Sequence, residues 1–235
     1  MPYEAVIFDL FGTLVPPFTS GPFEQLVAEM SAAMGVDPAA FRRAWVYDTA
    51  DARMTGAYGT AKAEVEEIAR ALGVPPTAAQ VAAAERARLE FYRRALAPRT
   101  DAVATLRALR GLGLRLGLIS DCTHEAPLLW PETPFATLID APVFSCLEGV
   151  RKPEPRLFRL ACERLGVEPG ACIYVADGFR GELATARSLG MEAVLIEVPG
   201  EVTPEFAPDE AATWDGLRIR ALAELVELAR RQESL

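Results

Sequence analysis

Residues 3–14 read YEAVIFDLFGTL, and this stretch decides how the rest of the chain is interpreted. A mostly apolar run ends at a lone acid, Asp9, and Gly12 and Thr13 then interrupt the pattern. Such a run predicts a buried strand that opens into a loop at the acid. In an open parallel sheet, ligands bind at the carboxyl ends of the strands, so Asp9 is a candidate for chemistry. An aspartate that only accepts backbone N–H groups in a turn explains this segment alone equally well.

Length and composition favour a folded globular protein. The chain has 235 residues, of which 51% are hydrophobic, enough for one large domain or a core with a small accessory domain. Its net charge of −9 and its pI near 4.8 argue against binding to nucleic acid or to an anionic membrane surface. A local basic patch that holds a small anionic substrate remains compatible with this charge.

The sequence also bears on where the protein works. Residues 1–15 lack a basic leader followed by a long apolar core, and no apolar run reaches roughly 18 residues. We therefore expect a cytoplasmic protein that does not enter a membrane. The cysteines lack C-x-x-C spacing, which indicates reduced, mostly buried thiols rather than a zinc knuckle or a redox pair: Cys122, Cys146, Cys162 and Cys172.

Residues 23–96 predict a helical insert, because apolar residues recur at helical spacing and no strand pattern is present. Four helices are expected, with start and stop signals at Pro22 and Gly35, Asp37-Pro38, Thr60 and Gly73, and a capping box of Thr77 with Gln80. Residues 54–59 (MTGAYG) interrupt the second helical pattern and are a candidate for a flexible or site-facing segment. The basic residues of the insert are expected on solvated helix faces, with a substrate contact as the alternative: Arg42, Arg43, Arg53 and Lys62.

From residue 100 the pattern alternates between strands and helices. Strands are expected over residues 114–120, 171–176 and 192–198, and helices over 101–112 (capped by Thr100), 155–165 and 181–189. Residues 198–212 are expected to form a surface loop, and residues 217–231 an amphipathic helix. This rhythm predicts an α/β fold with a doubly wound, Rossmann-like parallel sheet covered on both faces, to which the helical bundle is added.

Polar groups follow apolar runs at four junctions that should meet at one crevice. Asp9 supplies a carboxylate suited to nucleophilic attack. Ser120 and Lys152 supply a hydroxyl and an ammonium suited to binding an anion. Asp177 and Glu182 are two acids suited to a hard cation. Gly12 would allow the backbone a positive φ or a close approach to a ligand, and Thr13 adds a second hydroxyl.

The order and spacing of these residues resemble the haloacid dehalogenase superfamily of hydrolases. The first motif of that family matches Asp9-Leu10-Phe11-Gly12-Thr13, the second Ser120, the third Lys152-Pro153, and the fourth Asp177 with Glu182. The resemblance spans nearly the whole chain. It implies a core domain of residues 1–16 and 97–235 and a helical cap domain of residues 17–96.

The resemblance also implies a chemistry. Asp9 would attack the substrate and form a covalent intermediate that water cleaves, and in phosphatases of the family Mg²⁺ is held by residues matching Asp9, the Phe11 carbonyl and Asp177, with Glu182 acting directly or through water. Ser120, the Asp121 backbone N–H and Lys152 would bind phosphoryl oxygens, and the loop of Phe11, Gly12 and Thr13 would also contact the substrate. The implied function is a Mg²⁺-dependent phosphatase for a small phosphorylated metabolite, as a monomer or homodimer.

Phe11 departs from the phosphatase pattern. Typical phosphatases of the family carry an acid there that protonates the leaving oxygen, and dehalogenases carry an aromatic residue. A 2-haloacid dehalogenase-like enzyme is therefore an alternative, opposed by Asp177 and by Phe158, where dehalogenases have Tyr. A module that binds the cation and anion without turnover is a third possibility.

Other residues near the predicted site have two interpretations each. His124 and Glu125 follow Ser120 closely enough to replace the missing acid, but an exposed loop imidazole and a helix-start acid are the simpler interpretations. The backbone of Asp121 is expected to matter more than its side chain. Trp130, with Phe11 and Tyr58, is a candidate for an apolar wall or for ordinary core packing.

Overall fold

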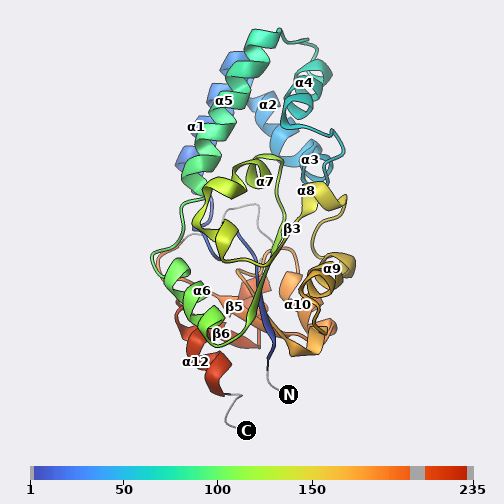
Figure 1. Ribbon diagram of the computed structural model, residues 1–235. Helices are drawn as coiled ribbons and strands as arrows, with labels where there is room; N and C mark the ends of the chain where they lie inside the picture. Colours follow the sequence, from blue (N-terminus) through green and yellow to red (C-terminus); the bar gives the residue numbers. More distant parts are fainter. Residues whose placement is uncertain (1–2, 202–209, 232–235) are drawn as a thin grey trace.

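A six-stranded, all-parallel sheet forms the centre of the computed structural model, which describes residues 3–201 and 210–231 (Figure 1). The strand order is β3-β2-β1-β4-β5-β6, so β1 lies between β2 and β4. The strands are β1 (Ala5–Phe8), β2 (Arg115–Ser120), β3 (Ala141–Phe144), β4 (Cys172–Ala176), β5 (Glu192–Ile196) and β6 (Leu217–Ile219). The predicted doubly wound α/β fold is confirmed.

Helices cover both faces of the sheet, and the side chains of β1 alternate between the two layers. Val6 and Phe8 belong to a buried cluster with residues of α6 (Ala102–Gly111) and α12 (Glu224–Arg231). Ala5 and Ile7 belong to a second cluster with residues of α9 (Pro155–Leu165) and α10 (Glu182–Ser188). Burying a side chain such as Val6, Ile7 or Phe8 stabilises the fold by about 1.5–3 kcal/mol, so β1, which Asp9 follows, is held from both faces.

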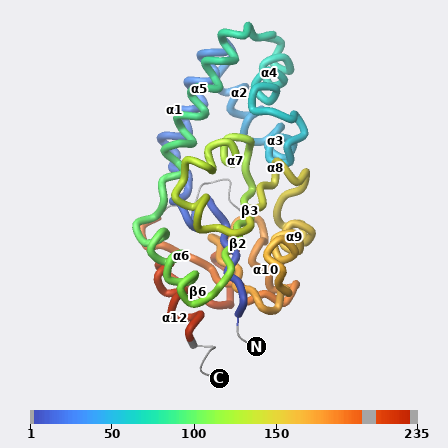
Figure 2. Tube along the Cα trace, in the orientation of Figure 1, coloured from blue at the N-terminus to red at the C-terminus, as the bar shows by residue number. Residues whose placement is uncertain are grey.

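The helical insert leaves the core after β1 and returns to it before α6, as the chain trace in Figure 2 shows. It comprises α1 (Ser20–Met34), α2 (Pro38–Arg43), a π-helical turn η1 (Ala44–Asp48), α3 (Ala50–Met54), α4 (Ala61–Ala71) and α5 (Ala78–Ala95). These helices share a hydrophobic cluster of their own. Figure 1 shows them above the sheet, with the short helices α7 (Glu125–Leu129) and α8 (Ser145–Glu148) between the two parts.

Most of the local helix signals in the insert are confirmed: Gly35 ends α1 as predicted, but α1 begins at Ser20 and not at Pro22. Asp37 and Thr60 accept hydrogen bonds from the backbone N–H groups three residues on, and Thr77 forms a reciprocal capping box with Gln80. The prediction of four helices is wrong, because the second one is divided into α2, η1 and α3. At Thr49 the backbone N–H bonds to the Ala44 carbonyl, five residues back, and the hydroxyl donates to the same oxygen at 2.8 Å. This π-type bond re-aims the chain between α2 and α3.

Three predictions in the α/β half are corrected. Thr100 does not cap α6: Asp101 stands at the N-cap, and its carboxylate accepts from the Ala223 backbone instead. Residues 217–231 are not one helix, because Leu217–Ile219 pairs with β5 as edge strand β6. Residues 198–212 are not all loop, since α11 spans Glu210–Thr213; the rest of that prediction falls largely on residues 202–209, outside the described residues.

The remaining short elements are the 3-10 turns η2 (Trp130–Glu132), η3 (Pro134–Thr137) and η4 (Pro169–Ala171). All four cysteines are free and buried, as expected. Within the described part of the chain, every helix is too short or too polar to span a lipid bilayer.

Candidate active site

The carboxyl ends of β1 and β4 bring Asp9 and Asp177 together, because the two strands are neighbours in the sheet. Lys152, from the loop before α9, donates hydrogen bonds to Asp9 Oδ1 and to Glu182 Oε2. Thr13 Oγ1 donates to the other Asp9 oxygen at 3.1 Å. The structure therefore places four of the predicted site residues within direct contact, in a region where Asp9, Lys152 and Glu182 are at most 5% exposed.

Three carboxylates form an acidic cluster at this point. One oxygen from each of Asp9, Asp177 and Glu182 lies within 4.8 Å of the others. Asp177 Oδ1 is buried without a hydrogen-bond partner among the described residues. Buried polar atoms are nearly always paired, so an orphaned carboxylate oxygen beside two further oxygen donors fits a hard divalent cation.

The pKa values of the residues in this cluster also fit a bound divalent cation. Burial raises the pKa of Asp177 to about 7, and the nearby Asp9 charge adds to this. Burial also raises the pKa of Glu182 to about 8 against the opposing effect of Lys152. Burial lowers the pKa of Lys152, but the Asp9 and Glu182 carboxylates outweigh it and raise that pKa overall. One ammonium thus faces three carboxylates, and a divalent cation would remove the imbalance.

The acidic cluster leaves no room for a side chain at Gly12. Its φ is +89°, and a Cβ built there would lie 2.1 Å from Asp177 Oδ2. A side chain at this position would therefore displace the fourth-motif acid. The predicted positive φ and close approach are both present, although the contact is with Asp177.

Ser120 lies at the end of β2, as predicted, but its side chain is fully buried. Its hydroxyl has no hydrogen-bond partner among the described residues, and it does not line the cavity described below. Asp121 does line that cavity, and its side chain has a larger role than expected: it accepts from the Lys152 backbone N–H at 2.9 Å and from Arg151 Nε at 3.0 Å. The carboxylate of Asp121 thus positions the loop that carries Lys152.

A cavity of about 400 Å³ joins the acidic cluster to the helical insert. Asp9, Lys152 and Asp177 line it from the core. Its apolar wall comes from Phe11 and from aromatic residues of the insert, namely Phe18, Phe23, Trp45, Tyr47 and Tyr92. The Phe11 ring lies 4.6 Å from that of Phe18 and meets Tyr92 edge to face.

The predicted wall residues Trp130 and Tyr58 do not line this cavity. Trp130 packs against Phe135 and Phe144 in the core, so its aromatic ring serves the fold. Sequence spacing could not tell an aromatic residue of the cavity wall from one of the core. The wall is assembled from residues far apart in the chain, among them residues 11, 18, 45 and 92.

The basic residues of the insert divide into two groups. Arg42, Arg43 and Lys62 lie on the surface, paired with Glu24, Asp48 and Glu66, as predicted. Arg53 is different: only 4% of it is exposed, and it lines the cavity. The prediction of a solvated face for Arg53 is wrong. Arg151 and Arg180, which no sequence motif marks as site residues, line the cavity from the core side.

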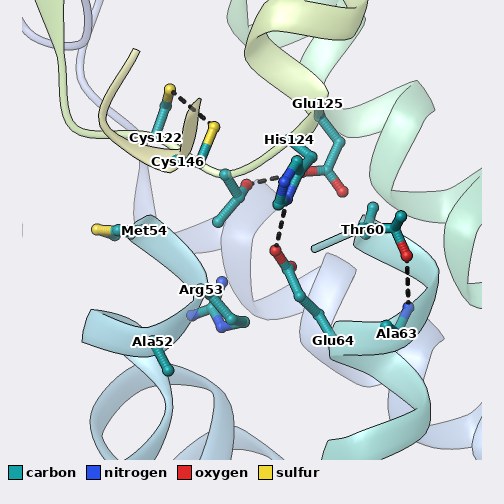
Figure 3. A network of polar contacts seen from close by, with 12 residues as sticks. Ala52, Arg53, Met54, Thr60, Ala63, Glu64, Cys122, His124, Glu125 and Cys146 are labelled. Carbon is teal, nitrogen blue, oxygen red and sulfur yellow. Dashed lines mark hydrogen bonds and ion pairs between the residues drawn. The ribbon is translucent and has the colours of Figure 1, made fainter. Parts of the chain in front are cut away.

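His124 and Glu125 belong to a buried polar network between the insert and the core, shown in Figure 3. His124 Nδ1 contacts Glu64 Oε1 at 3.1 Å, so it is not the exposed loop imidazole expected. Arg88 of α5 forms ion pairs with both Glu64 and Glu125. Glu125 does begin a helix, α7, but its carboxylate is buried. Neither His124 nor Glu125 lines the cavity, which removes both from the candidates for the missing acid.

A family model described as haloacid dehalogenase-like hydrolase matches residues 3–190. Among curated relatives, phosphoglycolate phosphatase of Shigella boydii is 29% identical over 211 residues, covering 81% of this chain and 80% of the relative. Glyceraldehyde 3-phosphate phosphatase of Methanopyrus kandleri is 32% identical over 130 residues, 54% of this chain and 55% of the relative. The alignment with acyl-CoA dehydrogenase family member 10 of Mus musculus is 30% identical over 46% of this chain and spans 10% of that relative.

Solved structures resemble the whole fold. The phosphatase from Thermococcus onnurineus has a TM-score of 0.65 and 25% identity, covering 96% of this chain and 97% of the other. The L-2-haloacid dehalogenase from Xanthobacter autotrophicus has a TM-score of 0.63 and 18% identity, covering 97% and 98%. At that level of identity the second likeness concerns the fold alone.

Proposed function

The chain belongs to the haloacid dehalogenase-like hydrolases, and from this premise we propose that it is a Mg²⁺-dependent phosphatase for a small phosphorylated metabolite. The observation that carries the proposal is the cluster of Asp9, Asp177 and Glu182, in which one buried Asp177 oxygen has no hydrogen-bond partner among the described residues. The curated relatives named as phosphatases support the same choice. A dehalogenase has no use for this cation site, since its halide leaves without phosphoryl charge to neutralise.

The proposed reaction begins at Asp9. Its carboxylate attacks the phosphorus atom in line with the ester oxygen, the bond from phosphorus to that oxygen breaks, and an aspartyl phosphate forms on Asp9. Water then attacks the same phosphorus and releases inorganic phosphate and the free carboxylate. Thr13, which bonds to one Asp9 oxygen, orients the nucleophile for this attack.

The surrounding residues bind the phosphoryl group. Lys152 moves one of its N–H donors from Asp9 to a phosphoryl oxygen as substrate enters, and the Asp121 backbone N–H binds another. Ser120 is buried outside the cavity wall, so in this proposal its hydroxyl must turn toward the cavity to bind a further phosphoryl oxygen. Bound Mg²⁺, held by Asp9, Asp177 and the Phe11 carbonyl with support from Glu182, would screen the repulsion between the nucleophile and the phosphoryl oxygens. In this proposal residues 17–96 form the cap domain that closes the cavity, and residues 1–16 and 97–235 form the core.

Phe11 limits the rate with poor leaving groups. It cannot protonate the departing oxygen, and neither His124 nor Glu125 reaches the cavity to do so. General acid catalysis contributes about 10² to 10⁴ in rate, so water must supply the proton at a corresponding cost. Phe11 also keeps a second candidate function open, because an aromatic wall beside Asp9 suits cleavage of a carbon–halogen bond.

A release assay tests the proposal. The protein is incubated with a panel of phosphate monoesters and with 2-chloropropionate, each in Mg²⁺ or in EDTA, beside Asp9→Asn. We expect phosphate release that needs Mg²⁺ and is lost in the variant. Chloride release that persists in EDTA would replace the phosphatase by the dehalogenase, and metal binding without either product would indicate a module that does not turn over.

A further inference from the structure

Arg53 is the one buried arginine without a carboxylate partner among residues 3–201 and 210–231. The other three are ion-paired: Arg88 with Glu64 and Glu125, Arg99 with Glu201, and Arg151 with Asp121 and Asp51. No carboxylate oxygen of the described residues lies within 4.0 Å of the Arg53 guanidinium. Figure 3 shows the nearby Glu64 carboxylate turned toward His124, with which it forms a hydrogen bond.

This arrangement is costly for the free protein. Buried charges in proteins are normally paired, because removing an unpaired charge from water is strongly unfavourable. Burial lowers the pKa of Arg53 to about 10, and the neighbouring Arg88 charge contributes to this. A bound anion would offset that cost.

The guanidinium of Arg53 is held in a fixed orientation. It lies 3.9 Å over the ring of Trp45, Nη2 donates to the Trp45 carbonyl at 2.5 Å, and Nε donates to Thr49 Oγ1 at 3.3 Å. A guanidinium has five N–H donors, so three remain, on Nη1 and Nη2. Those two nitrogens form the fork that binds the two oxygens of a carboxylate.

Arg53 lies where it can contact a substrate whose phosphoryl group is at Asp9. It lines the same cavity of about 400 Å³ as Asp9 and Lys152, but from α3 of the helical insert. The cavity wall also contains the rings of Phe11 and Tyr92. The other two arginines at this cavity have carboxylate partners: Arg151 pairs with Asp121 and Asp51, and Nη2 of the more exposed Arg180 lies 3.9 Å from Asp51 Oδ1. An anion bound at Arg53 would thus be the far end of a molecule whose phosphoryl group reaches Asp9.

We propose that Arg53 binds a carboxylate at the end of the substrate opposite the phosphoryl group, which makes the substrate a phosphorylated hydroxy acid. This inference rests on the proposed phosphatase function and narrows it. A carboxylate is favoured over a second phosphoryl group because it matches the two-nitrogen fork, and because a dianion would cost more to desolvate beside the aromatic wall.

Binding of non-hydrolysable ligands tests the inference independently of turnover. Isothermal titration calorimetry in the presence of Mg²⁺ measures the dissociation constants of 3-phosphonopropionate and 3-hydroxypropylphosphonate. The second ligand replaces the carboxylate of the first by a neutral group of similar size. We expect the wild-type protein to prefer the first by about 10- to 100-fold, the usual worth of a hydrogen-bonded charge pair. Arg53→Gln should lose the preference, Arg53→Lys should retain part of it, and the surface variant Arg43→Gln should retain all of it. Circular dichroism and the melting temperature show that each variant is folded.

The outcomes separate this inference from the proposed function. Equal binding of the two ligands by the wild type, or an unchanged preference in folded Arg53→Gln, overturns the role of Arg53 whether or not the protein releases phosphate. Tighter binding of propane-1,3-diylbisphosphonate than of 3-phosphonopropionate overturns the assignment of a carboxylate. An Arg53-dependent preference in a protein that hydrolyses no phosphate ester supports the anion site and refutes the phosphatase.

Discussion

At the scale of single residues, Phe11 decides the character of the chemistry. The family resemblance implies an acid at this position in phosphatases, whereas here the Phe11 ring packs against Phe18 and Tyr92 beside the cavity. The proposed metal site does not depend on this side chain, because only the backbone carbonyl of position 11 would be a ligand. A substitution at this position should therefore change proton transfer without removing the cation.

We expect Phe11→Asp to raise kcat/KM for alkyl phosphates, because the new carboxylic acid can protonate a poor leaving group. The gain should be at least tenfold, part of the 10² to 10⁴ that general acid catalysis typically contributes. For p-nitrophenyl phosphate, whose leaving group needs no proton, little change is expected. Phe11→Asn, which has the same shape as the Asp variant but no acidic proton, is the control. Equal gains for Asn and Asp would show that the effect is not proton transfer.

Some of the site could be predicted residue by residue, and some could not. Asp9 and Asp177 meet as expected, because they follow the neighbouring parallel strands β1 and β4. Lys152 and Glu182 join them as expected from the loop before α9 and from the start of α10. Arg53 was misjudged, because an arginine in a helical pattern gives no sign of whether it faces solvent or a cavity formed with a distant segment.

At the scale of elements, the helical insert is joined to the core by Arg88. This residue of α5 is fully buried, pairs with Glu64 of α4 and Glu125 of α7, and donates to the Ala61 carbonyl at 2.8 Å. Three helices from two parts of the molecule therefore depend on one guanidinium.

Arg88→Met should lower the free energy of unfolding by about 3–5 kcal/mol, since it leaves two buried carboxylates without their cation. Arg94→Met, on the exposed side of the same helix, should change it by less than about 0.5 kcal/mol. Urea denaturation of both variants and the wild type measures the difference. A loss of under about 1 kcal/mol for Arg88→Met would mean that the network does not hold the insert on the core.

The elements also show which structural signals are local. The caps at Asp37, Thr60 and Thr77 lie within four residues of what they bond, so sequence reasoning found them. Strand β6 was mistaken for helix because its three residues are strand only by pairing with β5, a tertiary contact that overrides local preference. The π turn at Thr49 likewise has no clear sequence signature.

At the scale of the whole molecule, the acidic cluster links stability to pH. The pKa of Asp177 is about 7 in the folded protein against an ordinary value of 3.8, and that of Glu182 is about 8 against 4.5. Between these values the folded state binds protons that the unfolded state does not. The free energy of unfolding of the metal-free protein therefore falls as pH rises from about 4 to 8.

Thermal unfolding in EDTA and in Mg²⁺ at pH 5.5 and pH 8 measures this linkage. We expect a lower melting temperature at pH 8 in EDTA, and a larger gain from Mg²⁺ at pH 8 than at pH 5.5, because protons and cation compete for the same oxygens. Asp177→Asn should reduce both the pH dependence of the melting temperature in EDTA and the pH dependence of the gain from Mg²⁺. A gain from Mg²⁺ that is equal at the two pH values, or that survives in the variant, would place the cation elsewhere.

The overall architecture could be predicted from the sequence more completely than the individual contacts. Its strand–helix rhythm and the order of four motifs along the chain indicated a doubly wound sheet with an inserted helical bundle. The contacts between the two parts were not predictable, since Glu64, Arg88 and Glu125 are separated by more than twenty residues each and no spacing rule connects them.

The central claim is that Asp9 and Asp177 hold a divalent cation beside the nucleophile. Crystals grown with Mn²⁺ in place of Mg²⁺ test it through the anomalous scattering of the ion. The account predicts one strong peak at about 2.0–2.3 Å from an oxygen of Asp9 and an oxygen of Asp177, near the Phe11 carbonyl. A map without a peak there, with Lys152 and Thr13 still the hydrogen-bond partners of Asp9, would contradict it.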